Sequence, residues 1–209
     1  MKIVLDSLGA NAFINLVRTM MLCRLESVRP IAFSVGTTSD VCNISDNVEE
    51  DMSEFISNVS SSCYAIDSGT DLAKLELSVD GTLSFAQESS QLAAQGLKVL
   101  NLGVSEVLHS LCSVPVTIYF RKAAGHFTID ENEEFLEARG VDVSTLVVTN
   151  SRHSPVSRFG FKQEDVAGGK TVFEISLQTD GSVTEDDAVK TVLSMIADDA
   201  KTTLASSFQ

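Results

Sequence analysis

The sequence predicts an α+β fold, because strand-like and helical patterns occupy separate segments of the chain. Residues Lys170–Thr179 alternate between apolar and polar side chains, which is typical of a strand with one buried face. In Leu8–Arg24 and again in Thr184–Leu204, apolar residues recur every three or four positions, as in amphipathic helices. The 209 residues, 44% of them hydrophobic, suffice for one large or two small domains with buried cores.

The amino-terminal segment predicts a short strand followed by a helix. Residues Met1–Leu5 form the strand candidate, and Asp6 and Ser7 are able to cap the helix Leu8–Arg24. Judged by its residues alone, this helix belongs to a core. The strand-like segment Val28–Val35 follows it.

The middle of the chain begins with the polar, turn-rich segment Gly36–Asp46. A helix is predicted next, within Asn47–Ile56, with Glu50 and Asp51 as capping acids of its first turn. The apolar residues expected to face inwards are Met52, Phe55, Ile56 and Val59.

Short strands and turns dominate the following residues. The pattern in Leu97–Cys112 is ambiguous, being strand-like at first and helical from Val104 to Leu111. The other predicted elements are strands at Tyr64–Asp67, Leu72–Val79 and Val114–Arg121 and a short helix within Gln87–Gln95.

The last third of the chain predicts a β-hairpin and a long helix. A strand at Val156–Lys162 is followed by a hairpin turn at Gly168-Gly169 and by the strand Lys170–Thr179. Thr184 is the expected N-cap of the long helix, with Asp187 three residues later.

Composition argues against several classes of function. The formal net charge of −14 is unsuited to a free-standing nucleic-acid binder, which needs a basic patch to neutralise phosphates. The four cysteines are scattered without a C-x-x-C pair, which favours reduced intracellular thiols over disulfides or a zinc site. No apolar run is long enough to cross a bilayer and no signal peptide is recognisable, so we expect a soluble, cytoplasmic protein that does not bind membranes.

Neither a catalytic group nor a metal or cofactor site is predicted. His126 lies near the acidic loop residues Asp130–Glu134, but the spacing is not that of metal ligands. His109 is expected on a helix or loop face, and His153 in an extended linker. No nucleophile elbow accompanies these histidines.

The carboxy-terminal part of the chain resembles a known family. Its pattern is S-P-V-x-R, a strand, T-D-G-S-V-T with two acidic residues, and a long amphipathic helix. This ordered run is similar to the end of the amino-terminal domain of bacterial RNA polymerase α subunits. The resemblance is also strong at Leu8–Arg24, Val48–Asn58 and Gly125–Ile129. The residues that carry the resemblance are Ser154, Pro155, Val156, Arg158, Thr179, Asp180, Gly181, Ser182, Thr184, Asp186, Asp187 and Ala188.

The resemblance implies a discontinuous dimerisation and assembly domain, residues 1–26 plus 154–209, with a mixed α/β domain, 27–153, inserted into it. Such subunits have no active site of their own. They dimerise and carry the β and β′ catalytic subunits of the polymerase, so a homodimer, or a heterodimer with a second α-like chain, is expected. The implied dimer-interface residues are Phe13, Leu16, Val17, Met20, Val189, Val192, Leu193 and Ile196.

The resemblance also implies two sets of subunit contacts. A β-like subunit would contact Asn15, Arg18, Glu50 and Asp51, although Ile14 and Asn15 replace the arginine pair of the family. A β′-like subunit would contact Ser154, Pro155, Val156, Arg158 and Lys162.

Further expectations follow from the resemblance. The carboxy-terminal promoter-binding domain of α subunits is not expected in this chain, so no direct promoter DNA binding is expected. A cytoplasmic, nucleoid-associated location follows, with a phage or organellar source as one interpretation. Two other functions stay open: a decoy that copies the α fold to sequester polymerase subunits, and a small α+β hydrolase that uses His126 or His153.

Overall fold

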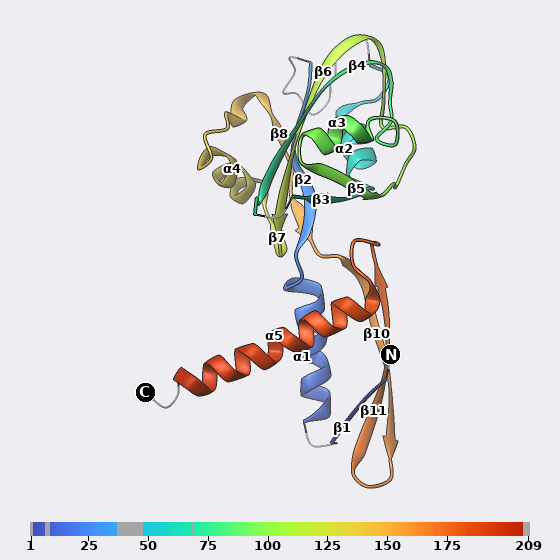
Figure 1. Cartoon of the computed structure of the whole chain (residues 1–209), viewed down its shortest axis with the longest axis vertical. Helices are drawn as coiled ribbons and strands as arrows, with labels where there is room; N and C mark the ends of the chain where they lie inside the picture. Colours follow the sequence, from blue (N-terminus) through green and yellow to red (C-terminus); the bar gives the residue numbers. More distant parts are fainter. Residues whose placement is uncertain (1, 7–8, 37–47, 68, 207–209) are drawn as a thin grey trace. The chain divides into compact units, whose positions relative to one another are not determined.

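The computed structural model describes residues 2–6, 9–36, 48–67 and 69–206. It confirms a mixed α+β fold, with mostly antiparallel sheets. The chain forms two compact units (Figure 1). The first joins Met1–Leu25 to Ser154–Gln209, and the second is Glu26–His153. The predicted turn-rich segment Gly36–Asp46 lies, apart from its first residue, outside the described residues.

The first unit is an antiparallel sheet with two helices packed on it. The order of its strands is β1-β11-β10. The predicted helices are confirmed as α1 and α5, which pack together through one apolar cluster. Figure 1 shows them crossing within this unit. The elements are β1 (Lys2–Asp6), α1 (Ala10–Cys23), β10 (Val156–Val166), β11 (Lys170–Thr179) and α5 (Glu185–Ser206).

The core of this unit lies between the helices and one face of the sheet. Val17 of α1 and Val192 of α5 are fully buried in the cluster between the helices. Ile14 of α1 packs with Phe173 of β11, both also fully buried. Complete burial of each such side chain contributes about 2 kcal/mol to folding, so this helix pair is an integral part of the unit.

Strand β10 contains a β-bulge near its start. The register of β10 with β11 shifts between Val156 and Arg158, and the hydroxyl of Ser157 donates to the carbonyl of Gln178 at 3.0 Å. One extra residue reverses the alternation of side chains. Val156 can therefore face the core while Arg158 lies on the opposite face of the sheet.

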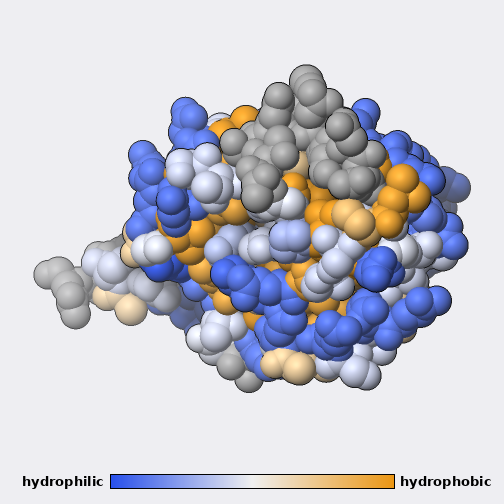
Figure 2. Space-filling model, turned by 90° about the horizontal axis from the view of Figure 1, so that it is seen from above, coloured by the Kyte–Doolittle hydropathy of each residue, from blue (hydrophilic) through white to orange (hydrophobic). Residues whose placement is uncertain are grey.

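The second unit is built on a larger antiparallel sheet. Its strand order is β4-β6-β2-β3-β5, and β8 also pairs with β2. Figure 2 looks onto this unit and shows apolar surface among hydrophilic side chains. The elements are β2 (Ser27–Val35), α2 (Met52–Ser60), β3 (Cys63–Ile66), β4 (Leu72–Leu83), α3 (Ser89–Ala94), β5 (Leu97–Asn101), β6 (Leu108–Ala123), β7 (Gly125–Phe127), α4 (Ile129–Glu137), η1 (Val143–Thr145), β8 (Val147–Val148) and β9 (Ser151–His153).

The largest core of the protein lies inside this unit. Phe33 of β2 meets Phe55 of α2 edge to face, with the ring centroids 5.9 Å apart. The prediction that Met52, Phe55, Ile56 and Val59 face inwards is confirmed, since the first, second and fourth are fully buried and Ile56 packs against them.

Several local predictions are wrong. Helix α1 is not capped by Asp6: its N-cap is Gly9, in the left-handed region at φ 83° and without a side-chain cap bond. The helical interpretation of Val104–Leu111 fails, because β6 already begins at Leu108. Consequently His109 lies in a strand, not on a helix or a loop. His153 belongs to β9, where it is buried, and not to a linker.

The acidic residues after His126 form a helix, α4, where the sequence predicted a loop. The side chain of Thr128 accepts from the backbone of Glu131, and the carboxylate of Glu131 accepts from the backbone of Thr128 at 2.8 Å. This reciprocal pair is a capping box, so the T-x-x-E spacing was a usable signal for the helix start.

Candidate protein-interaction surfaces

Helices α1 and α5 leave uncharged surface exposed. On α1, the side chains of Ala12, Leu16, Thr19 and Cys23 are exposed and recur every three or four residues, so they share one face. Leu16 is 45% exposed. An exposed leucine alone is ordinary, but a stripe without charge is unusual on a chain with a net charge of −14.

The apolar stripe of α5 continues beyond the residues that pack against α1. Ala188, Val189 and Val192 are buried, whereas the later members of the stripe, Ala200 and Leu204, are exposed. Leu204 is 61% exposed. The carboxy-terminal half of α5 therefore presents an apolar edge that no described residue covers.

The predicted dimer-interface residues fall into two groups. Val17, Met20, Val189 and Val192 are buried within the chain, so they stabilise this unit and offer no surface to a partner. The residues that retain surface are Phe13, Leu16, Leu193 and Ile196.

The sheet of the first unit has a polar outer face. The register places Lys2, Glu174 and Lys162 in one row across the three strands. Arg158 lies on the same face of β10 as Lys162, opposite Gln178. Among the described residues, neither Arg158 nor Lys162 has an acidic side chain within ion-pair distance. Both side chains are exposed, with Glu174 opposite Lys162 in the register.

The other predicted β′-contact residues are buried. Ser154 and Pro155 directly precede β10 and Val156 is its first residue, and all three are buried. The hydroxyl of Ser154 donates to the carbonyl of Val156 at 3.1 Å. Within the predicted set, only Arg158 and Lys162 can be reached from outside.

The predicted β-contact residues occupy both units. Asn15 and Arg18 are exposed on α1. Asp51 is the N-cap of α2, where its carboxylate accepts from the backbone of Glu54 at 2.7 Å. Glu50 precedes this helix. A contact with a partner through these residues stays a prediction.

The carboxylate of Glu50 is bound inside the chain. It accepts from the backbone N–H of His109 at 2.7 Å and lies 2.6 Å from the Nδ1 atom of the same residue. The hydrogen bond to Glu50 raises the pKa of His109 above its usual value, and the charge of Glu106 adds to this. The pair attaches the segment before α2 to the start of β6.

A chain of buried polar groups includes His153. The hydroxyl of Ser151 lies 2.8 Å from Nε2 of His153, and the Nδ1 atom lies 3.0 Å from the carbonyl of Ser27. A carbonyl only accepts, so Nδ1 carries the proton and Nε2 accepts from the serine. The side chain of Asn132 donates to the same serine hydroxyl at 3.0 Å.

Arg121 is the last member of this chain of hydrogen-bonded groups. It donates to the side chain of Asn132 at 2.9 Å, and its guanidinium lies 3.7 Å and 4.0 Å from the ring centroids of Phe127 and Phe135. Burial lowers the pKa of His153 to about 4, and the positive charge of Arg121 acts in the same direction. The Ser151 hydroxyl beside His153 is buried and also accepts from Asn132, so these groups support the fold.

The low pKa of His153 predicts a loss of stability in acid. The folded-state pKa is about 4 and the usual value is 6.5, so between these values the unfolded chain binds a proton that the folded chain does not. The contribution of His153 is complete above pH 6.5 and is lost as the pH falls towards 4, by up to about 3 kcal/mol. Urea unfolding of wild type and His153→Gln from pH 7 to 4 should therefore converge in acid.

A matched control is His109→Gln. The pKa of His109 is raised, so its contribution is present at low pH and is lost as the pH rises. The two variants should change the slope of stability against pH in opposite directions. Equal slopes for wild type and His153→Gln would contradict the assigned protonation state of His153.

Two further observations concern metal binding and membrane-spanning helices. His126 is exposed on β7, and no group of three or more histidine, cysteine or acidic residues in the described segments could hold a metal ion. None of the described helices combines the length and apolarity that a bilayer-spanning helix needs.

Comparison with known proteins adds independent information. No protein-family model matches the chain. It is 24% identical over 188 residues to the DNA-directed RNA polymerase subunit alpha of Aster yellows witches'-broom phytoplasma (strain AYWB). It is 22% identical over 188 residues to the same subunit of Onion yellows phytoplasma (strain OY-M). Each match covers 88% of this chain but only 55% of the relative, so the chain spans about half the length of these curated relatives.

Proposed function

We propose that the chain is an α-like subunit of a multisubunit RNA polymerase, and that it dimerises and carries the β-like and β′-like catalytic subunits. The distant similarity to two polymerase α subunits supports a polymerase-related role. In this proposal the unit formed by Met1–Leu25 and Ser154–Gln209 is the assembly domain. The chain supplies no catalytic group, and nucleotidyl transfer takes place on its partners.

The observation that carries the proposal is the uncovered apolar surface of α1 and α5. Leu16 and Leu204 are exposed on a unit whose core is already filled by Val17 and Val192. A small domain has difficulty covering such stripes with its own residues. A second copy would bring the same stripes, and a two-fold interface would bury both sets at once.

The exposed positive charges of the outer sheet face supply a second surface. Arg158 and Lys162 lie four residues apart on this face of β10, on a chain whose net charge is −14. Such charges favour encounter with an acidic surface and fix the orientation of docking. In the proposal this surface binds the β′-like subunit, while the inserted unit Glu26–His153 is free for other contacts.

Co-expression with the β-like and β′-like subunits of the same genome tests the proposal. We expect an affinity tag on this chain to capture both partners in a particle that contains two copies of the chain and elongates RNA. A particle that assembles but cannot elongate RNA would instead indicate a decoy. No capture of either partner would refute the assembly role.

A further inference from the structure

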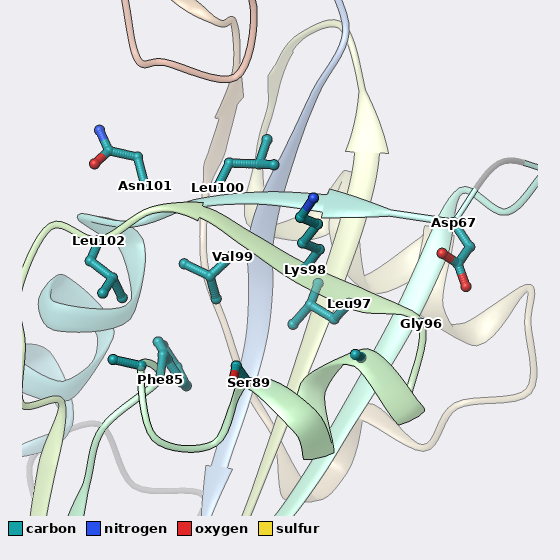
Figure 3. Close-up of a pocket in the computed structure, with 12 residues that line it drawn as sticks. Asp67, Phe85, Ser89, Gly96, Leu97, Lys98, Val99, Leu100, Asn101 and Leu102 are labelled. Atoms are coloured by element: carbon teal, nitrogen blue, oxygen red, sulfur yellow. The ribbon is translucent and has the colours of Figure 1, made fainter.

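A pocket of about 720 Å³ opens beside the last strand of the larger sheet. Its volume lies in the range typical of ligand sites. It is bounded by β5 and α3 and has apolar side chains of Phe85, Leu97 and Val99 in its lining. Figure 3 shows Val99 and Leu102 pointing towards Phe85, whereas Lys98 and Leu100 point the opposite way.

The lining includes every residue from Gly96 to Leu102. Successive side chains of a strand point to opposite faces, so a pocket on one face would be lined by every second residue. A continuous run means that the pocket reaches the backbone edge of β5. In the described part of the chain β5 is a terminal strand, because β3 pairs with one edge and no strand pairs with the other.

At the opposite end of the sheet, a side chain pairs with the outer edge of the terminal strand. Strand β4 is the other terminal strand, and the side-chain amide of Gln95 pairs with it. The backbone N–H of Glu76 donates to the Gln95 amide oxygen at 2.7 Å, and the Gln95 amide nitrogen donates to the Glu76 carbonyl at 3.0 Å. The amide takes the place of a neighbouring strand at this point. At β5, no described strand lies beside the outer edge.

We propose that the edge of β5 binds an extended peptide segment of a partner protein by strand addition. The backbone of the segment would pair with β5, and its alternate aliphatic side chains would enter the pocket against Phe85 and Val99. Exposed Leu100 and Leu102 would be covered at the same time. This inference concerns the Glu26–His153 unit and does not depend on the proposed assembly role.

The charge of the pocket lining indicates which residues the bound segment should contain. The charged residues of the pocket lining are Asp67 and Lys98, and no acidic side chain in the described residues pairs with Lys98. A carboxylate of the segment would satisfy it. The expected ligand is therefore an extended, aliphatic segment that carries an acidic residue.

The test uses a fluorescein-labelled nonapeptide that alternates valine and threonine around a central glutamate. Fluorescence anisotropy with the full chain should show saturable binding with a dissociation constant in the micromolar range. A peptide of the same sequence with alternate backbone nitrogens methylated keeps the side chains but loses the ladder donors. It should bind about tenfold more weakly or worse.

Two protein variants locate the binding site. Ala93 is exposed on α3 and lines the pocket, so Ala93→Trp should fill the pocket without disturbing the core and should weaken binding about tenfold. Leu111→Trp is the matched control, because Leu111 is 74% exposed on β6 and does not line the pocket. Binding to this control should equal wild type.

Three results would overturn the proposal. One is the absence of saturable binding. Another is equal binding of the methylated and unmethylated peptides, which would mean that the strand edge is not used. The third is unchanged binding to Ala93→Trp. Displacement of the labelled peptide by unlabelled glutamate-containing peptide, but not by dodecanoate, would support strand addition over a site for small apolar molecules.

Discussion

Leu16→Asp should convert the chain from a dimer to a monomer at micromolar concentration. Leu16 is 45% exposed on α1, so an aspartate there is tolerated in the isolated unit. In a two-fold interface the change introduces two carboxylates, each costing several kcal/mol when buried without a partner. At about 1.4 kcal/mol per tenfold, the dimer dissociation constant should rise at least about a hundredfold.

Sedimentation equilibrium measures the dimer dissociation constant directly. Protein concentrations from about 1 to about 100 μM cover the range of typical dimer affinities. Leu204→Asp should act similarly from α5, since Leu204 is exposed at the end of its stripe. Leu111→Asp is the matched control: it places the same charge on an exposed leucine of the other unit and should leave the dimer intact. If the wild-type chain is monomeric, the homodimer hypothesis is wrong. A heterodimer with a second α-like chain would then have to replace it.

Sequence periodicity predicted the elements that bury only one of their faces. Helices α1 and α5 and the hairpin of β10 and β11 were predictable because an apolar stripe or alternating face marks each one. The extent of β6 was not. Its residues from Leu108 to Leu111 have a spacing that also suits a helix, and only pairing with β4 decides between the two.

The surfaces were less predictable than the elements. The bulge at Ser157 changes which side chains of β10 face outwards, and nothing local in the sequence marks it. The contact of Glu50 with His109 joins residues 59 apart in sequence. The pocket beside β5 depends on which strand ends the sheet. Arg158 and Lys162 are four residues apart, and the register of β10 with β11 places them on one face.

Arg158→Glu should prevent capture of the β′-like subunit and leave the dimer of the chain intact. Arg158 is exposed on the outer face of the sheet, whereas the helices that are proposed to dimerise pack on the other face. The substitution changes the charge by two units where an acidic partner surface is expected to dock. Like charges across a docking surface oppose association, and a reduction of tenfold or more is a reasonable order of magnitude.

The assay is co-expression with a tagged β′-like subunit, followed by comparison of the amounts captured. Lys162→Glu, on the same face, should also reduce capture. Arg152→Glu makes the same change of charge on an exposed arginine of the other unit, so it separates local docking from the effect of net charge. If Arg158→Glu assembles a fully active polymerase as wild type does, β10 is not the contact. If Arg152→Glu loses capture to the same degree, overall charge and not this strand controls association.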